Sequence, residues 1–383
     1  NGVSANTTAK ITSQHDIRLN EILNKSGFNK AKLYVQANEN AIEYIENTVT
    51  RNNIECGFKK TYACVITERE DKIKSLESEY EAAVRLGINA EMMLNPEFNA
   101  TKNAEIEAAL KFFNQAHFNP VPYLDYLAQN FCDNDKYRIY ENTRAVDIIK
   151  DNHKPYKVIT DNGVKISAHT IVIATHFPFF DKRGLYFTKL YPSSSYIYSF
   201  TAEDGFNEGM FITAEEGYSL RSYIHNGENV ILIAGENHDT AKGGYFEKHY
   251  QDLKKKAEQL FKVNKFMWKW FAQDYATPDK LPYAGILCKS MPNVYVMTGY
   301  DKWGMTNSTA AAKIVSDKIA EGRSPCEEAF SPQRIFRSFY YLGNYFYKNF
   351  KTVFTLIGGR LKRLPHRSNI KKDESRLMKI NGI

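Results

Sequence analysis

Residues 293–322, NVYVMTGYDKWGMTNSTAAAKIVSDKIAEG, form the segment best suited to bind an anionic or electron-rich group. The apolar run Val294–Met297 predicts a buried strand, which leads through Gly299 and Gly304 into a helical pattern. The first turn of this helix contains Thr306, and its backbone amides would be free to bind a phosphate or a carbonyl oxygen. Many α/β proteins contain a strand, a glycine loop and a helix in this order, so a purely structural role is an equal alternative.

A second segment, TIVIATHFP, places polar side chains directly after a short apolar strand. Ile171–Ala174 is wholly apolar, which is typical of a parallel strand buried on both faces. Thr175 and His176 would follow at the carboxyl edge of the sheet, where α/β proteins bind ligands. His176 has two interpretations, a residue of the site or a hydrogen-bonded structural histidine. A third segment, ATPDKLPYAG at residues 276–285, predicts either a rigid turn before the Gly299 strand or a simple loop.

The segments that position these residues alternate between helical and strand-like patterns, which indicates an α/β (α+β) fold. Strand-like segments between residues 196 and 235 are separated by glycine turns and predict an antiparallel sheet. A long helix is predicted from Phe246 to Phe271, and the DNG sequence at residues 161–163 predicts a hairpin turn. The other expected elements are two helices within residues 16–53 broken near Ser26 and Gly27, strands at Cys56–Ile66 and Ala108–Asn114, and helices at Asp71–Leu86 and Pro122–Phe131.

The composition is that of an ordinary globular protein. The chain has 383 residues, of which 43% are apolar and 25% charged, enough for two domains or one domain with a large insertion. Its net charge is +7, but residues 331–383 contain twelve Lys or Arg against two acidic residues and so carry +10. The rest of the chain therefore carries −3, which argues against nucleic acid as a partner of the globular body.

The five cysteines show neither CxxC spacing nor paired Cys and His residues, so neither a disulfide framework nor a metal site is expected. Such cysteines fit a reducing cytoplasm. No apolar run approaches the roughly 20 residues that span a bilayer, and the first ten residues contain no stretch of the signal-peptide type. Because the sequence starts at Asn1 rather than Met, loss of an upstream targeting segment stays open.

In their order and spacing, these segments resemble the D-amino-acid oxidase superfamily of FAD-dependent oxidoreductases over nearly the whole chain to about residue 330. More narrowly, the chain resembles the branch that often carries a C-terminal Rieske iron–sulfur domain. This resemblance implies a truncated FAD/NAD(P)-binding Rossmann-like domain with an inserted antiparallel-sheet substrate domain. The segments that carry it are NTTAKITSQHD, NQAHFNPVPYLDYLA, IYENTRAV, TIVIATHFPF, GENHD, PDKLPYAG and TGYDKWGMT.

The resemblance also implies which residues lie near FAD, mostly through their backbones. The segment along the pyrophosphate would be Asn6, Thr7, Thr8, Ala9 and Lys10, with Gln14 and His15 approaching the ring system. Ala145 and Val146 would meet the adenine, and Ala174, Thr175 and His176 would pass near the cofactor. The flavin ring would be enclosed by Gly299, Tyr300, Trp303, Gly304, Met305 and Thr306.

Several side chains are candidates for the chemistry. Arg221, in YSLRSY, would bind a substrate carboxylate through its guanidinium group, or it is a surface arginine. Lys302 and Trp303 lie within the predicted flavin loop, so one of them is expected to face the ring. His15 or His176 would assist proton removal from an amine. Tyr218, Tyr223 and His238 either line the same cavity or serve in packing.

Two departures from the family pattern indicate a fragment. There is no GxGxxG after a first strand and no acidic residue about twenty positions later, which we interpret as truncation. The chain ends at SRLMKINGI without the Cys and His ligand pairs of a Rieske domain. The expected division is FAD-binding at 1–50, 116–185 and 276–330, substrate-binding at 51–115 and 186–275, and a basic aromatic tail or linker at 331–383.

The predicted function is an FAD-dependent oxidoreductase that oxidises an amine or amino-acid-like C–N bond by hydride transfer to flavin. The alternative is a non-catalytic scaffold or electron-relay fragment of a larger flavin and Rieske redox protein. In the tail, apolar residues at near-helical spacing would pack on a following Rieske or electron-transfer domain, which we favour over contact with an anionic membrane. These residues are Phe339, Leu342, Phe346, Phe350, Ile357 and Leu361.

Overall fold

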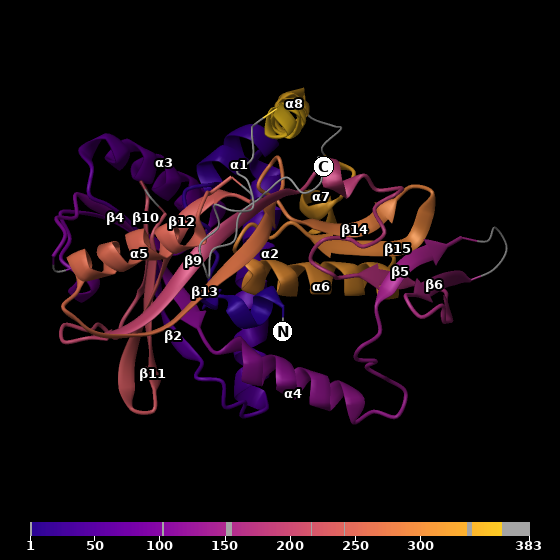
Figure 1. Ribbon diagram of the computed structural model, residues 1–383, viewed down its shortest axis with the longest axis horizontal. Coiled ribbons are helices and arrows are strands. Elements are labelled where there is room, and N and C mark those ends of the chain that lie inside the picture. Colours follow the sequence, from indigo (N-terminus) through magenta and orange to yellow (C-terminus); the bar gives the residue numbers. More distant parts are fainter. Residues whose placement is uncertain are drawn as a thin grey trace, which may run out of the picture.

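The computed structural model describes residues 2–101, 103–150, 155–215, 217–240, 242–334 and 339–361 of the chain. Within these residues the strands form one nine-stranded sheet and two three-stranded sheets. Figure 1 shows the large sheet on one side of the molecule and the small sheets on the other, with helices α2 (Phe28–Arg51) and α6 (Gly304–Glu321) between them. This mixed architecture confirms the predicted α/β (α+β) fold class.

The large sheet is antiparallel except where β2 and β10 pair in parallel. The side chains of its long strands alternate between two faces. One face packs on α5 (Phe246–Leu260), where the Tyr196 and Tyr250 rings lie 5.0 Å apart. The strands follow one another in the order β1 (Lys10–Ile11), β4 (Ala108–His117), β2 (Lys59–Thr67), β10 (Met210–Thr213), β11 (Ser219–His225), β12 (Glu228–Asp239), β9 (Tyr191–Ala202) and β13 (Val263–Ala276), with β3 (Ala90–Leu94) beside β4.

The helix predicted from Phe246 to Phe271 is wrong in its second half. Helix α5 ends at Leu260, and the chain continues as β13, the outermost strand beyond β9. The sequence after Leu260 is rich in aromatic residues, which strands favour. Pairing with β9 gives these backbone groups hydrogen-bond partners across the sheet, as in the pair formed by Trp270 and Ile197.

One small sheet consists of β14 (Tyr283–Cys288), β15 (Met291–Thr298) and β8 (Ile171–Ile173), with β8 parallel to β15. Ile171 and Ile173 are buried in a core beneath this sheet, but Val172 is 42% exposed. The expectation that Ile171–Ala174 is buried on both faces is therefore wrong for one face. Helix α6 covers the same face as Val172, where it packs on β14 and β15 but leaves β8 uncovered.

Two helices form the predicted pair near the N-terminus. Helix α1 (Leu19–Ser26) and helix α2 meet at Gly27, whose φ of +84° suits glycine, so the break predicted near Ser26 and Gly27 is confirmed. Alanines of α2 and α6 share one core cluster, which lets these helices pack closely. The remaining elements are η1 (Val3–Asn6), α3 (Glu70–Leu86), η2 (Asn99–Thr101), α4 (Pro120–Cys132), β5 (Ala145–Ile149), β6 (Tyr156–Thr160), β7 (Lys165–Ala168), η3 (Tyr186–Thr188) and α7 (Glu327–Phe330).

Helix α8 (Phe339–Leu361) lies at the top of the molecule in Figure 1. The side-chain amide of Asn349 donates to the Thr188 carbonyl at 2.9 Å, which fixes the helix on the body. Its outer face exposes Phe346 and Phe350, two residues of the predicted apolar series, whereas the side chains of Phe339, Ile357 and Leu361 lie outside the described part. Among the helices described, none has the length and apolar character needed to cross a bilayer.

Candidate functional site

A cavity of about 1190 Å³ lies between η1, the start of α6 and the face of the large sheet opposite α5. Ile197, Ala234 and Ser219 are neighbours across β9, β12 and β11, so they form one row on this face, and all three line the cavity. The side chains on this part of the wall are small or aliphatic. They leave room for a ligand against the sheet.

The loop before α6 forms the opposite side of the cavity. Its backbone turns sharply, because Asp301 and Lys302 both adopt positive φ, at +49° and +72°. Trp303 precedes the helix without a side-chain cap, so the first amides of α6 have no acceptor within the helix. Since Trp303 and Gly304 line the cavity, the positive end of the α6 dipole lies at its edge.

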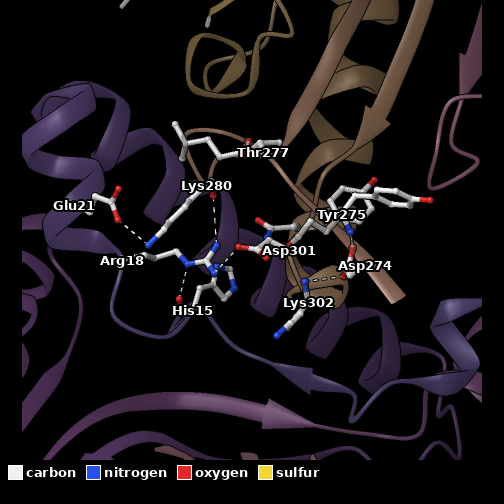
Figure 2. A network of polar contacts seen from close by, with 12 residues as sticks. His15, Arg18, Glu21, Asp274, Tyr275, Thr277, Lys280, Asp301 and Lys302 are labelled. Carbon is white, nitrogen blue, oxygen red and sulfur yellow. Dashed lines mark hydrogen bonds and ion pairs between the residues drawn. The ribbon is translucent and has the colours of Figure 1, made fainter. Parts of the chain in front are cut away.

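A network of polar contacts holds this loop in place (Figure 2). Arg18 lies 3.1 Å from Asp301, and it also donates to the carbonyl of Lys280 at 3.4 Å and to that of His15. Burial opposes the charge on Arg18, but the nearby Asp301 and Tyr34 outweigh it and raise the pKa of Arg18. The loop is thereby tied to the segment before α1 and to the 276–285 turn.

His15 belongs to the core behind the loop. Its ring stacks on Trp303 with centroids 5.0 Å apart, and its Nε2 lies 2.7 Å from the Thr12 carbonyl. Nδ1 contacts the Tyr34 hydroxyl, so both ring nitrogens are engaged. Burial, together with the charge of Arg18, lowers the pKa of His15 well below its usual range. A neutral His15 therefore supports Trp303, and it is not among the residues that line the cavity.

His176 and Asp274 meet on the cavity wall. Nε2 of His176 lies 3.0 Å from Oδ1 of Asp274, and Tyr275 packs its ring at a steep angle against the His176 ring, with centroids 4.8 Å apart. The other oxygen of Asp274 accepts the backbone N–H of Lys302 at 2.7 Å, as Figure 2 shows. The same carboxylate thus links His176, after β8, to the loop before α6.

Lys302 presents an exposed side chain to the cavity. In the described part of the chain, its Nζ has no hydrogen-bond or ion-pair partner, and Figure 2 shows it pointing away from Asp274. The surrounding protein displaces water and lowers the pKa of Lys302, although Asp301 and other acidic groups oppose this shift. Lys302 is therefore a cation available to a ligand.

Arg221 is 6% exposed and lies beside Lys10 and His117 beneath the segment that lines the cavity. Arg221 Nε donates to the Thr8 carbonyl, and Nη1 donates to His117 Nδ1 at 3.3 Å. Burial lowers the pKa of Arg221 to about 10, and burial with the charge of Arg221 lowers that of Lys10 to about 7. Of these three residues, only Lys10 is among the lining residues.

The structure brings most of the expected residues to one cavity. Those that line it are Asn6, Thr7, Thr8, Lys10, Ala174, Thr175, His176, Tyr300, Lys302, Trp303, Gly304 and Met305. Those absent from its lining are Ala9, Gln14, His15, Ala145, Val146, Arg221, Gly299 and Thr306, together with Tyr218, Tyr223 and His238. Arg221 lies behind the lining and contacts it through the carbonyl of Thr8.

Sequence reasoning missed Asp274, Arg18 and Asp301. One signal for Asp274 was present, since it is a lone acidic residue within the aromatic strand sequence WKWFAQDYA. A carboxylate at such a position needs partners when it is buried. No comparable local signal existed for Arg18 and Asp301, which lie 283 positions apart.

The cavity fits the ring end of a flavin dinucleotide. Its volume of about 1190 Å³ exceeds the roughly 300–1,000 Å³ typical of pockets for small ligands. Thr7 and Thr8 line one wall, Trp303 lines another, and the α6 dipole favours an electron-rich carbonyl at the edge. The GxGxxG turn does not occur in this sequence. The described residues that line the cavity therefore offer contacts for the flavin ring and its linker.

Comparison with known proteins agrees with this geometry. The Rieske 2Fe-2S iron–sulfur protein YhfW of Bacillus subtilis (strain 168) is 35% identical over 335 residues, which cover 87% of this chain and 64% of that protein. The fold is similar to that of glycine oxidase from Geobacillus kaustophilus, with a TM-score of 0.68 and 16% identity over 87% of this chain and 89% of the oxidase. It is also similar to iminodiacetate oxidase from Chelativorans sp. BNC1, with a TM-score of 0.65 and 11% identity over 86% and 89% of the two chains.

The family model for FAD-dependent oxidoreductases, DAO, matches residues 1–318. This match includes the NTTAK segment, both strands β8 and β15, and the loop at the start of α6. The sequence-based expectation of the family, of its FAD cofactor and of a Rieske-associated relative is thus confirmed. The chain belongs to the FAD-dependent oxidoreductase (DAO) family, and it spans 64% of the length of its Rieske-named relative.

Proposed function

We propose that the protein oxidises a carbon–nitrogen bond in an amine or amino-acid-like substrate with FAD bound in the cavity. The observation that carries this proposal is the convergence on one cavity of the α6 N-terminus, the η1 segment and the His176–Asp274 pair. Several proteins of similar fold support the substrate class, since they are named glycine oxidase, L-proline dehydrogenase and L-amino acid deaminase.

The chain's own residues would bind and orient rather than perform the redox step. FAD supplies the acceptor for two electrons. The free amides of α6 and its dipole would stabilise an electron-rich carbonyl of the ring, while Thr7 and Thr8 would follow the linker. Trp303, backed by His15, would exclude water from one side.

The substrate would lie against the row formed by Ile197, Ala234 and Ser219 on the large sheet. Lys302 reaches the cavity with an Nζ that has no partner among the described residues, so we infer that it attracts the carboxylate of an amino-acid-like substrate. Arg221, the sequence-based candidate for this role, would act indirectly by fixing the carbonyl of Thr8.

The test is an absorbance spectrum of the purified protein in the near-ultraviolet and visible range after incubation with FAD and removal of free cofactor. Two flavin bands that bleach under anaerobic conditions on addition of amines or amino acids are the expected result. Bleaching by other reductants but by none of a broad amine panel would contradict the proposed substrate class.

A second candidate function is an electron-relay scaffold within a larger flavin and Rieske protein. It is favoured by the name of the Bacillus relative, of which the chain spans 64%, and by the exposed Phe346 and Phe350 on α8, which suit a domain partner. Flavin that is reduced or oxidised only in the presence of an iron–sulfur partner would support this role. The predicted cytoplasmic location remains part of both proposals.

A further inference from the structure

Asp274 carries a carboxylate whose geometry is fixed on both oxygens. It is 8% exposed near the end of β13, and Oδ1 accepts the backbone N–H of Tyr275 at 2.7 Å as well as contacting His176. Oδ2 accepts the backbone N–H of Lys302 at 2.7 Å. With these donors in place, the carboxylate cannot turn away from the His176 ring without losing a hydrogen bond.

Contacts hold both the backbone and the ring of His176, and one ring nitrogen has no partner among the described residues. The Thr298 hydroxyl donates to the His176 carbonyl, and the Tyr275 ring packs against the imidazole. Nε2–H of His176 donates to the Asp274 carboxylate, so a neutral His176 carries its proton on Nε2 and its lone pair on Nδ1. Nδ1 has no hydrogen-bond partner among the residues described, and the side chain is 28% exposed on the cavity wall.

Other candidate bases are less suited. His15 uses both ring nitrogens in the core, and His117 is buried outside the lining, where burial and nearby cations lower its pKa to about 3. Lys10 lines the cavity with a pKa lowered to about 7, but its Nζ donates to the Phe211 carbonyl at 2.8 Å. Lys10 therefore remains a rival among the described groups, as does Lys302, whose Nζ reaches the cavity with a lowered pKa, and the experiment must separate both from His176.

We propose that His176 is the base that removes a proton from the substrate ammonium group, with Asp274 as its positioning residue. This inference rests on the proposed function, which makes the substrate an amine. One N–H bond of the ammonium breaks, its electron pair stays on nitrogen, and the proton forms a bond with Nδ1 of His176. The resulting imidazolium is paired with the Asp274 carboxylate, and the neutral amine has the lone pair that supports loss of hydride from the adjacent carbon.

The groups that face His176 come from two elements besides its own. Asp274 and Tyr275 lie on β13, and Lys302 lies in the loop before α6. Burial and the charge of Asp274 raise the pKa of Tyr275, so its phenol stays protonated over the range of the experiment. The Lys302 ammonium contacts neither His176 nor Asp274, since only its backbone N–H reaches the carboxylate.

The experiment measures anaerobic flavin reduction by an amine in single turnovers across pH, using the whole chain reconstituted with FAD. His176 adopts φ of +63°, which glycine tolerates, so His176→Gly removes the ring without straining the turn. We expect reduction to slow by about 10²-fold or more, the acid limb of the pH profile to change, and added imidazole to restore the rate in a saturable manner. His169→Gln, at an exposed histidine, is the matched control.

Two readouts do not depend on turnover. FAD affinity and the visible spectrum of bound flavin should be equal in wild type and His176→Gly, which separates proton transfer from cofactor binding. Nitrogen chemical shifts of the His176 ring should show the Nε2-protonated tautomer in wild type and lose that preference in Asp274→Asn. If that preference is absent from the wild type, the positioning role of Asp274 is wrong.

The remaining outcomes decide between His176, the two lysines Lys10 and Lys302, and the proposed function itself. An unchanged pH profile and rate in His176→Gly would overturn the inference. Loss of the acid limb in Lys10→Met or Lys302→Met, with the limb retained in His176→Gly, would also overturn it. If no amine reduces the wild-type flavin, the proposed function is wrong. The tautomer measurement would still show whether Asp274 fixes the protonated nitrogen of His176.

Discussion

The Arg18 guanidinium lies 3.1 Å from the Asp301 carboxylate and thereby joins two segments that border the cavity from opposite ends of the chain. Arg18 precedes α1, and Asp301 lies in the loop that leads into α6. The Arg18 side chain is 6% exposed and that of Asp301 is 21% exposed. This pair therefore contributes both to stability and to the shape of the site.

Replacing Arg18 with Met should lower the free energy of unfolding by about 2–3 kcal/mol, because Asp301 then loses a charged donor in a largely buried position. Urea unfolding followed by circular dichroism measures this change. A double-mutant cycle with Asp301→Asn should show coupling between the two positions. Additive effects of the two substitutions would show that the contact itself contributes little.

The Arg334–Asp279 pair should contribute more, because both side chains are almost fully buried, at 4% and 2% exposure. The guanidinium binds both carboxylate oxygens, with distances of 2.6 Å and 2.8 Å. Arg334→Met should destabilise the fold by about 3–5 kcal/mol, since it leaves a buried charge without its partner. Arg334→Lys keeps the charge but not the two-point contact, so it should fall between wild type and Arg334→Met in urea unfolding.

Stability should decrease as pH falls from about 6.5 towards 3, because burial and the charges of Arg221 and neighbouring lysines lower the pKa of His117 to about 3 in the folded state. The unfolded chain binds this proton more readily than the folded chain, so acid favours unfolding by up to about 1.4 kcal/mol per pH unit. His117→Gln should flatten this part of the pH dependence of the unfolding midpoint. His169→Gln, at an exposed site, should leave the slope as in wild type.

Gly299 should not tolerate a side chain. Its φ is +79°, and a Cβ atom built there would lie 2.6 Å from Thr277 Cγ2. Gly299→Ala should therefore cost about 1–3 kcal/mol of stability, measured by urea unfolding. Gly304→Ala is the matched comparison, since a Cβ there meets nothing closer than 4.0 Å, and it should be neutral or stabilising. Equal effects at the two glycines would contradict the steric explanation.

Lys302→Met should weaken the use of amino-acid substrates, because it removes an exposed cation from the loop that borders the cavity. We expect KM for an amino acid to rise about tenfold. KM for the corresponding amine that lacks the carboxylate should change little. Lys302→Arg keeps the charge and should retain the preference. A uniform change for both substrates would indicate that Lys302 shapes the loop instead of binding a carboxylate.

The sequence by itself determined the family and much of the local structure. The break between α1 and α2 at Gly27, the turn at residues 161–163 and the strand, loop and helix around Gly304 all follow from short-range preferences. Glycine conformations, apolar periodicity and helix N-terminal residues act over a few positions, so they can be recognised without a structure. The order of these segments then indicated an FAD-dependent oxidoreductase.

Only the tertiary structure decided which side chains share the cavity. His176 and Asp274 are 98 positions apart. Asp274 lies on β13, which pairs with β9, and the first part of this strand was predicted as helix up to Phe271. Likewise, Arg221 points beneath Thr8 because the large sheet places it there, a relation with no local signal. Strand pairing and the partners of buried charges depend on residues far apart in the sequence. Buried polar groups must all find hydrogen-bond partners in the same folded structure, so these contacts cannot be read from local sequence.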